Sequence, residues 1–316
     1  MMIFYLINIY LIKKQRFDKK MGKRARKWGT LSDWWELFRT FAYTASIIPM
    51  LIAAVMLNEK DLLNLPLFFL LFFGVLGVHT GANIVNEYFD FKIGPDTLDA
   101  NIASTVIMEE RIEPELALDM ARLFFLHFLF FSVIFAYFLQ QPGIFLYALL
   151  GVLGGYFYTA PPLYFKYRGL GAISIFILFG YLLPQAVYYT FSGEIIFTIL
   201  FLPHSFLVTA IVFANNLGDD YIVVEQCQRQ RGFLIYLLLI LAAYFMVILA
   251  AFQQKVSWLP IIILITVTSF WAVRDLGQAF GGIADPEKFE KLDHRTAFLH
   301  FIFGFGWIIC LLWTVN

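Results

Sequence analysis

The sequence PLFFLLFFGVLGVHTGANIVNEYFD occupies residues 66–90 and decides the fold. Its first part is an almost unbroken run of apolar side chains. At about 1.5 Å per residue, a helix of this length crosses the hydrocarbon layer of a bilayer. Its last part carries two asparagines and two acids, at the point where the helix would leave the hydrocarbon. This stretch therefore predicts a membrane-spanning helix that ends in polar side chains.

The composition of the whole chain also indicates a membrane protein. Of 316 residues, 60% are hydrophobic, 19% aromatic and 15% charged, whereas soluble domains average about 45–50% apolar and about 25% charged. The long apolar runs exclude disorder, collagen and coiled coils, and their spacing excludes a β-barrel. Cys227 and Cys310 are too few and too scattered to predict a disulfide framework or a metal site. We expect an all-α integral membrane protein.

Nine apolar runs are long enough to span the bilayer. They cover roughly residues 35–57, 66–89, 117–139, 143–160, 169–190, 196–217, 233–252, 257–274 and 296–314. The interpretation is a transmembrane domain over residues 35–316, built as a bundle of about nine helices, with a basic extension over residues 1–34 before it. Gly151, Gly154 and Gly155 are expected to mark close helix packing, and the segment 275–295 is expected to be a solvated loop.

The distribution of charge predicts the orientation. Residues 13–27 contain nine Lys and Arg, which the positive-inside rule places in the cytoplasm. The loops predicted on the other side, residues 58–65, 140–142, 191–195 and 253–256, hold only Lys60 and Lys255 of the 23 basic residues. We expect a multi-pass protein with a cytoplasmic N-terminus, located in the cell membrane if the source is prokaryotic. The formal net charge of zero gives no reason to expect a nucleic-acid partner.

Polar side chains gather where the second run ends. Asn83, Asn86 and Asp90 fall on one face of a helix. Asp96 follows Gly94-Pro95, which breaks the helix and can fold Asp96 back towards that face. Carboxylates that converge repel one another unless a divalent cation lies between them. Oxygen ligands of this kind suit Mg²⁺ that carries a phosphate substrate.

A similar pattern ends the sixth run. Asn215, Asp219 and Glu225 have the same spacing, Asn-x3-Asp-x5-acid, as Asn86, Asp90 and Asp96. Because Asn and Asp are poor helix formers and are costly near hydrocarbon, two such columns predict a site. They are interpreted as two half-sites across a cavity, although chance alone could supply the second.

We call the two columns the first station (Asn83, Asn86, Asp90 and Asp96) and the second station (Asn215, Asp219 and Glu225). Two such stations at the mouth of an apolar bundle can bind a lipid diphosphate, with its tail among Phe and Leu side chains. Bound metal would help an allylic C–O bond to ionise, and aromatic faces would stabilise the resulting cation. The segment from Tyr158 to Arg168 supplies aromatic rings together with Lys166 and Arg168, which could hold diphosphate oxygens. The alternative is that these are ordinary interfacial aromatic and positive-inside residues.

Several of these motifs resemble one known family. Residues 86–97, NEYFDFKIGPDT, are similar to the first aspartate-rich motif of the UbiA superfamily of intramembrane prenyltransferases, particularly its MenA-like branch. Residues 158–162, 167–171, 215–219 and 296–300 resemble that branch as well. The resemblance implies a nine-helix bundle with a central cavity that opens near the cytoplasmic face. It also implies Mg²⁺-dependent transfer from a polyprenyl diphosphate to an aromatic acceptor such as 1,4-dihydroxy-2-naphthoate.

The resemblance also implies roles for particular residues. The predicted metal ligands are Asn86, Asp90, Asp96, Asp219, Asp220 and Glu225. The predicted catalytic residues are Asp90, Asp96, Asp219 and Tyr158. The predicted substrate-binding residues are Asn86, Asn215, Lys166, Arg168 and Arg231. The basic residues Lys166, Arg168, Arg229 and Arg231 match basic positions of the family only loosely.

The second motif departs from the family's pattern. Where the family usually has an arginine and a further acid, this chain has Gly218 and Val223. Either Asp220 or Glu225 substitutes for the missing ligand, or the second metal is weakly held, or the protein has drifted from catalysis. Ala172 replaces a position that is often acidic in the MenA-like branch, which puts the naphthoate acceptor in doubt more than the donor.

Three functions remain open at this point. The first is prenyl transfer to an aromatic quinone precursor. The second is transfer to another acceptor, such as a prenylglycerol phosphate. The third is a degenerate member that binds isoprenoid lipid without turnover, or a transporter. The lipid bilayer is the only other partner expected, and no obligatory protein partner is inferred.

Overall fold

The protein is described here from a computed structural model, which describes residues 28–93, 106–219 and 226–315. These residues form helices joined by short turns and contain no strand, apart from one isolated bridge between Trp28 and Ile112. The expected all-α fold is confirmed for the described part of the chain.

The helices follow the apolar runs of the sequence. They are α2 (Leu31–Leu37), α3 (Thr44–Asn58), α4 (Leu65–Ile93), α5 (Pro114–Phe138), α6 (Gly143–Phe157), α7 (Gly171–Ile177), α8 (Leu183–Ser192), α9 (Leu202–Asp219), α10 (Gln226–Gln254), α11 (Trp258–Gly282) and α12 (Leu292–Val315). Short 3-10 turns, Thr40–Tyr43 and Ile199–Phe201 among them, lead into α3 and α9.

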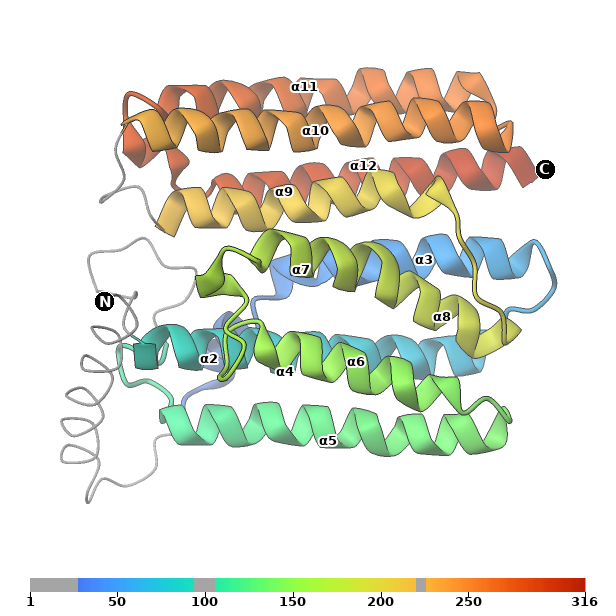
Figure 1. Cartoon of the computed structure of the whole chain (residues 1–316), viewed down its shortest axis with the longest axis horizontal. Coiled ribbons are helices and arrows are strands. Elements are labelled where there is room, and N and C mark those ends of the chain that lie inside the picture. The colour runs from blue at the N-terminus through green and yellow to red at the C-terminus, as the bar shows by residue number, and fades with distance from the viewer. Residues whose placement is uncertain (1–27, 94–105, 220–225, 316) are drawn as a thin grey trace.

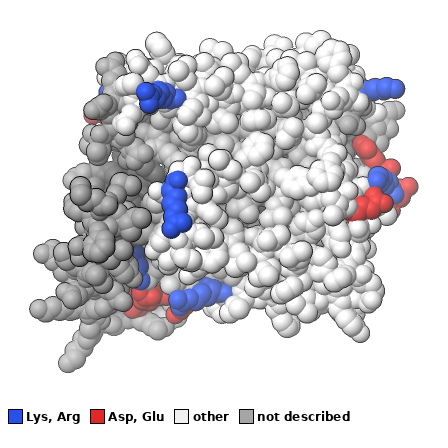
Figure 2. All heavy atoms as spheres, in the orientation of Figure 1, with Lys and Arg blue, Asp and Glu red and all other residues white. Residues whose placement is uncertain are grey.

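Eight segments within the described residues are long and apolar enough to cross a membrane. One further apolar helix, α6, has 15 residues and corresponds to the predicted span 143–160. A multi-pass integral membrane protein is therefore supported, while the count of nine spans stays a prediction. On the face shown in Figure 2, a broad band without charged side chains separates the charges near the two ends, as expected for a surface in contact with lipid tails.

The bundle has two groups of helices with a third between them (Figure 1). Helices α4, α5 and α6 pack together on one side, and α9 to α12 pack together on the other. The middle helices α3, α7 and α8 connect the two groups, since α3 contacts α8 and α12 and α7 contacts α9. Helices α4 and α9 both end at the same end of the bundle, which we call the Asp90 end.

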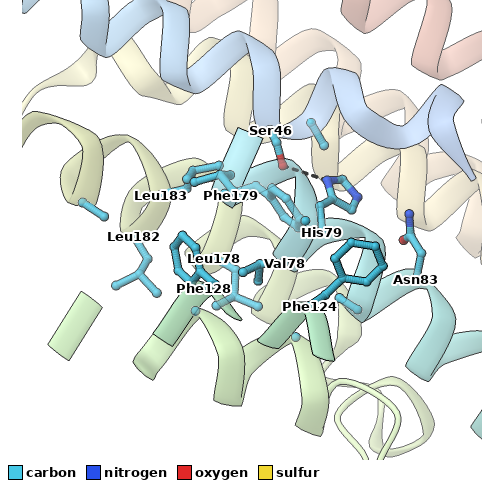
Figure 3. Close-up of a pocket in the computed structure, with 18 of the residues that line it drawn as sticks. Ser46, Val78, His79, Asn83, Phe124, Phe128, Leu178, Phe179, Leu182 and Leu183 are labelled. Carbon is cyan, nitrogen blue, oxygen red and sulfur yellow. Dashed lines mark hydrogen bonds between the residues drawn. The ribbon is translucent and has the colours of Figure 1, made fainter. Parts of the chain in front are cut away.

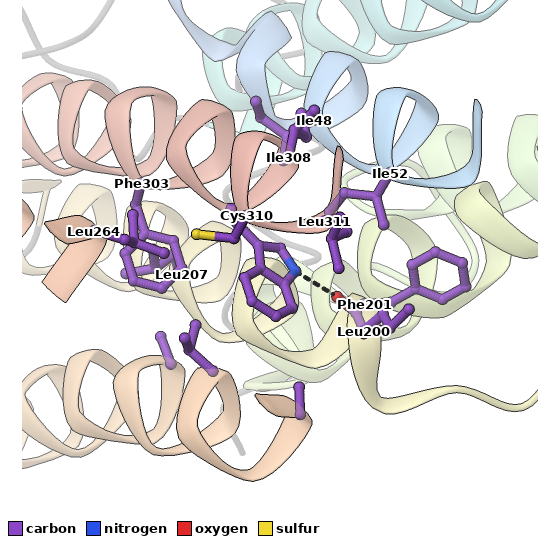
Figure 4. Packing of buried hydrophobic residues seen from close by; sticks show 14 of the residues in the cluster. Ile48, Ile52, Leu200, Phe201, Leu207, Leu264, Phe303, Ile308, Cys310 and Leu311 are labelled. Carbon is purple, nitrogen blue, oxygen red and sulfur yellow. Dashed lines mark hydrogen bonds between the residues drawn. The ribbon is translucent and has the colours of Figure 1, made fainter. Parts of the chain in front are cut away.

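The largest hydrophobic core fills the space between α3 and the α9–α12 group. Figure 4 shows Ile48 and Ile52 of α3 facing Ile308 and Leu311 of α12. The indole of the buried Trp307 donates a hydrogen bond of 3.0 Å to a backbone carbonyl in the turn before α9, so its one polar group is satisfied. This core packs the α9–α12 group against α3.

A π-helical segment, Leu178–Leu182, joins α7 to α8 within one span. Gly180 is needed there because a Cβ on it would lie 2.5 Å from the Cβ of Ser205 on α9. The widened turn leaves the carbonyl of Phe179 to accept a hydrogen bond of 3.2 Å from His204. Segments of this kind are frequent at functional sites; here the π-helical segment carries Phe179 to the wall of a cavity.

The prediction of a solvated loop over residues 275–295 was wrong. Helix α11 continues to Gly282, a 3-10 turn covers Pro286–Phe289, and α12 begins at Leu292. Asp275 is fully buried rather than solvated, with Arg274 at 3.3 Å from its carboxylate. The hydropathy of the sequence falls at Arg274 and Asp275 although the backbone stays helical. The predicted span 257–274 therefore ended before the helix does.

A cluster of charges fixes α2 beside the bundle. Asp33 and Thr30 form a capping box at the start of α2, and Arg111 donates hydrogen bonds of 2.6 Å to Asp33 and 2.8 Å to Glu36. Hydrogen bonds from Thr30, and then from Arg111, hold the pKa of Asp33 below its ordinary value of 3.8. The cluster holds the chain just ahead of Phe38 and Arg39, which reach the site described below.

We expect Asp33→Asn to lower the thermal unfolding midpoint at pH 7 by a few degrees. A carboxyl group with a depressed pKa stabilises the folded state above its unfolded pKa, and this contribution is lost as pH falls through the folded value. The difference between Asp33→Asn and the wild type should therefore shrink below about pH 3.8. Unfolding in detergent at pH 7 and pH 3 measures it; an equal difference at both pH values would contradict the assignment.

Candidate active site

One face of α4 carries a polar stripe in the second half of the helix. His79, Asn83, Asn86 and Asp90 follow one another at intervals of four, three and four residues. This spacing keeps them on one side of an α-helix. The amide of Asn83 donates a hydrogen bond of 2.8 Å to the carbonyl of Phe38. Asn83 therefore faces the turn before α3, and the sequence pattern had predicted that Asn83, Asn86 and Asp90 share one helical face.

The stripe lines a cavity of about 510 Å³. Its walls come mainly from α3 to α9, with Arg39 from the turn before α3 and Asp293 from α12, and most of its lining residues are apolar or aromatic. Along α4 it extends from Asn86 to Leu70, sixteen residues or about 24 Å. Figure 3 shows its middle part, where Phe124, Phe128 and Leu178 surround the space beside His79. A long apolar chain with a polar head would fit this shape.

The basic side chains and the amides at the cavity wall gather at the Asp90 end. Arg39, Asn86, Lys166 and Asn215 all line it there. Arg39 donates a hydrogen bond of 3.1 Å to the amide oxygen of Asn215. Asn86 on α4 and Asn215 on α9 belong to the two predicted stations, so one cavity joins both stations.

Asp90 is connected to this cavity through Lys166. The ammonium group of Lys166 donates to the carboxylate of Asp90 at 2.8 Å, and the hydroxyl of Tyr167 donates to its other oxygen. The side chains of Asp90 and Lys166 are only 7% and 14% exposed. The chain folds back after α6 so that the backbone N–H of Lys166 donates to the carbonyl of Tyr158 at 2.8 Å. Tyr158 lines the cavity as well.

The other predicted residues lie elsewhere or outside the described residues. Arg168 is exposed and donates to the carbonyl of Pro162 at 3.1 Å. Arg231 is exposed on α10, and Arg229 donates to the carbonyl of Ile283 at 3.1 Å. None of these three arginines lines the cavity, and their substrate-binding roles stay predictions. Asp96, Asp220 and Glu225, together with the side chain of Asp219, lie outside the described residues.

Four cavity or site residues were missed from the sequence. Arg39 and Asp293 line the cavity, although Asp293 was expected to be solvated. Tyr167 binds Asp90. The five histidines of the sequence form no metal-binding cluster pattern, so His79 was not among the predicted site residues, yet it lies four residues before Asn83 on the same helical face. That spacing was the available signal. Tyr167 lies in the motif at residues 167–171, but its contact with Asp90, like the positions of Arg39 and Asp293, depends on the packing of distant segments.

The chemistry of the site fits a divalent cation. The side-chain oxygen of Asn86 is buried and has no hydrogen-bond partner within the described residues, and Asp90 lies one turn further along α4. Hard oxygen donors of this kind suit Mg²⁺. The part of the chain that the structure describes contains no group of three or more His, Cys, Asp and Glu side chains close enough to hold a metal. A complete ligand set would therefore draw on residues beyond it or on substrate oxygens.

Comparison with known families decides what kind of protein has this cavity. The model of the UbiA prenyltransferase family matches residues 46–281. The chain belongs to the UbiA prenyltransferase family. Members of this family are prenyltransferases and generally use divalent metal ions. Asn86, Asp90, Lys166 and Asn215 all lie inside the matched range.

Individual UbiA relatives agree with this placement. The chain is 27% identical over 190 residues to a 1,4-dihydroxy-2-naphthoate octaprenyltransferase of Bacillus subtilis (strain 168), a match that covers 58% of this chain and 60% of that protein. It is 25% identical over 290 residues to UbiA prenyltransferase domain-containing protein 1 of Homo sapiens, covering 87% and 81%.

A solved structure shares the UbiA fold. It is that of a digeranylgeranylglyceryl phosphate synthase, which superposes with a TM-score of 0.55 at 18% identity and covers 89% of this chain and 98% of that one. The likeness supports the arrangement of helices, and so the UbiA-type bundle expected from the sequence motifs is confirmed.

Proposed function

We propose that this UbiA-family protein transfers a polyprenyl group from an allylic polyprenyl diphosphate to a hydroxylated aromatic acceptor such as 1,4-dihydroxy-2-naphthoate. The observation that carries the proposal is the cavity itself, which extends about 24 Å along α4, is lined mostly by apolar and aromatic side chains, and has its Lys, Arg and Asp side chains at the Asp90 end. The substrate it fits has a long hydrocarbon chain and one highly charged end. Residues 35–316 are proposed as the catalytic domain.

The diphosphate is proposed to bind at the Asp90 end. Lys166 and Arg39 supply cationic donors to the cavity from two separate segments, the α6–α7 connection and the turn before α3. The amide of Asn215 already accepts a hydrogen bond from Arg39. The fixed fork of the Arg39 guanidinium suits phosphate oxygens, whereas Lys166 contributes a compact charge.

The proposed metal is Mg²⁺, which Asn86 and Asp90 would hold together with the predicted ligands Asp96, Asp219, Asp220 and Glu225. When bound, a divalent cation neutralises the diphosphate and so favours breaking of the C–O bond. Lys166 now occupies one carboxylate oxygen of Asp90. A cation and a diphosphate at this place would let Lys166 transfer its hydrogen bond from Asp90 to the substrate.

The cavity wall is suited to a prenyl cation. Phe124, Phe128, Phe179 and Tyr158 line it, and aromatic faces attract a cation without reacting with it. The apolar wall also excludes water, which would otherwise capture the cation as an alcohol. Tyr158 is the aromatic residue among these at the Asp90 end, where we expect the reacting carbon to lie.

The naphthoate acceptor rests on the name of the Bacillus relative and on the first motif. Arg39 offers a cationic partner for an acceptor carboxylate in the cavity as well as for phosphate. Transfer to a prenylglycerol phosphate keeps the same donor site and differs only in the acceptor. Measured turnover with either acceptor would exclude the third alternative, a non-catalytic isoprenoid-binding member or a transporter.

The Asp90 end is proposed to face the cytoplasm. The loops that hold only two of the 23 Lys and Arg residues all lie at the opposite end of the bundle (Figure 1). The positive-inside rule assigns that opposite end to the outer side. The proposed location is the cell membrane, if the protein is prokaryotic, with the N-terminal arm inside.

The proposed function is tested with the purified protein in lipid nanodiscs. Labelled geranylgeranyl diphosphate is supplied with 1,4-dihydroxy-2-naphthoate, 4-hydroxybenzoate or geranylgeranylglycerol phosphate, with Mg²⁺ or with excess EDTA. We expect diphosphate release and a prenylated naphthoate with Mg²⁺, and loss of both with EDTA because the diphosphate is then not neutralised.

Each other outcome overturns a named part of the proposal. Product from the glycerol phosphate and not from the naphthoate would replace the acceptor. Donor binding without any diphosphate release would identify a non-catalytic member. Undiminished turnover in EDTA would remove the metal from the mechanism.

A further inference from the structure

His79 is a titratable side chain inside the cavity that the diphosphate site does not use. It lies on the polar stripe of α4, two turns before Asn86 and about 10 Å deeper along the helix. The residue is buried and lines the cavity. Ionisable side chains within membrane spans are costly and mark functional sites more often than packing sites.

The ring of His79 is held in a fixed orientation. Its Nδ1 lies 2.7 Å from the hydroxyl oxygen of Ser46 on α3, as the dashed line in Figure 3 shows. The rings of Phe179 and Tyr43 flank it at centroid distances of 5.1 and 5.4 Å. Within the described residues, the hydrogen bonds of this ring involve Nδ1 alone. Nε2 is therefore left for a molecule in the cavity.

The hydrogen bond to Ser46 sets what Nε2 can do. When Nδ1–H donates to the hydroxyl oxygen of Ser46, Nε2 carries the lone pair and can accept a proton. An imidazole that accepts through one nitrogen while a polar partner orients the other is the usual arrangement of a general base. The carboxylate of Asp293, also at the cavity wall, instead binds Nδ1 of His294 at 2.9 Å.

We propose that His79 is the catalytic base of the acceptor half-reaction, with Ser46 as its positioning residue. The inference rests on the proposed prenyl transfer. The hydroxyl proton of the aromatic acceptor moves to Nε2 of His79, and the O–H electron pair forms a C=O bond. The C1–O bond of the donor has by then broken, with diphosphate leaving with that electron pair, and the ring carbon bonds to C1 of the prenyl cation. The acceptor ring is then a dienone and His79 an imidazolium.

The second half of the reaction restores the aromatic ring of the acceptor and the neutral imidazole of His79. The new C–C bond is formed at a ring carbon that carries a hydrogen or a carboxylate. That substituent leaves as a proton, which the departed diphosphate accepts, or as CO₂, and the electron pair of its bond to the ring restores the aromatic ring. The imidazolium of His79 returns its proton to the carbonyl oxygen, so the hydroxyl and the neutral histidine are both regenerated. No oxidant, reductant or further reactant is needed.

The position of His79 fits this order of events. The diphosphate site lies around Asn86 and Lys166, and the cavity runs from there past His79 towards Leu70. A distance of about 10 Å along α4 leaves room for the reacting carbon and an aromatic ring between Asn86 and the imidazole. Water capture of the prenyl cation does not need His79, because the product then comes from donor and water alone.

The test measures two reactions of one variant in nanodiscs with Mg²⁺ and geranylgeranyl diphosphate. Donor-only diphosphate release reports ionisation, and transfer to 1,4-dihydroxy-2-naphthoate reports the acceptor half-reaction. We expect His79→Gln to lower kcat for transfer by roughly 100-fold or more, the usual contribution of a general base. We expect donor-only release and the KM for the donor to stay within a few-fold of the wild type.

Ser46→Ala keeps the imidazole and removes its orienting partner. We expect an intermediate loss of transfer, about tenfold, again with donor-only release retained. Ser269→Ala is the matched control, since Ser269 is a helical serine on α11 that binds the carbonyl of Thr266 and does not line the cavity. Ser46→Ala also keeps the inference testable if His79→Gln does not fold.

The contrary outcomes are distinct. Transfer by His79→Gln at the wild-type rate would overturn the inference, and so would an equal loss of transfer and donor-only release, because the residue would then serve the donor or the fold. If the wild type itself releases no diphosphate, the proposed function fails first and the inference falls with it.

Discussion

Asp90→Asn is expected to reduce both diphosphate release and prenyl transfer by roughly 1000-fold, at the upper end of what removal of one electrostatic group from a catalytic site costs. The substitution keeps the shape of the side chain and an oxygen that can accept from Tyr167. It removes the negative charge that would hold a divalent cation. It also removes the charge that now pairs with Lys166 at 2.8 Å. The loss is therefore electrostatic rather than steric.

Steady-state release of diphosphate from the donor alone measures the effect. Asp119→Asn is the matched control: Asp119 accepts a hydrogen bond of 2.8 Å from Arg122 at an exposed site on α5, away from the cavity. It should keep wild-type turnover because an exposed ion pair contributes little. If Asp90→Asn and Asp119→Asn behave alike, the first station is not the catalytic centre.

The same assay applied to Glu225→Gln asks whether the second station still works. Gly218 and Val223 replace an arginine and an acid of the family's second motif, which leaves Glu225 as one candidate substitute. A loss much smaller than that of Asp90→Asn would indicate a decayed second station. Comparable losses would support two working half-sites.

The local part of the site could be predicted from the sequence. Asn83, Asn86 and Asp90 share a face because an α-helix repeats every 3.6 residues, and this needs no knowledge of neighbouring helices. The same rule applies to His79, which a longer reading of the stripe would have included. The apolar runs likewise placed most spans to within a few residues, except where α10 and α11 continue through charged residues. The first span was also misplaced, because the chain breaks after α2 and α3 begins only at Thr44 rather than at residue 35.

The contacts between distant segments could not be predicted. Lys166 reaches Asp90 across 76 residues, and Arg39 reaches Asn215 across 176. These pairs depend on how α4, α9 and the α6–α7 connection pack, which no local pattern encodes. Arg168 illustrates the point, since it is two residues from Lys166 and yet points to the carbonyl of Pro162.

The glycines of α6 show the same limit. All three were expected to mark close helix packing, and the expectation holds for Gly154 and Gly155, where an added Cβ would lie 2.4 Å from Leu178 and 3.0 Å from Ala82. It was wrong for Gly151, which lines the cavity and has no atom within 4 Å of such a Cβ. The space beside Gly151 is part of the cavity rather than of a contact between helices.

Gly151→Trp is therefore expected to change which donors the protein accepts. Gly151 lies seven residues before Tyr158 on α6, about 10 Å from the proposed reacting end, with the far half of the cavity beyond it. An indole at this position would block that far half. We expect kcat/KM for octaprenyl diphosphate to fall by about 100-fold or more, as for a substrate that a filled pocket no longer admits. Geranyl diphosphate, which ends before Gly151, should lose only a few-fold.

Competition between the two donors in a single reaction gives the ratio directly, so that differences in the amount of folded protein cancel. Gly277→Trp is the matched control, because Gly277 on α11 has equally open space around it and does not line the cavity. If the tail instead leaves the bundle near Tyr158 and lies in the bilayer, Gly151→Trp would leave the ratio unchanged. The ratio therefore decides whether the cavity beyond Gly151 holds the prenyl chain.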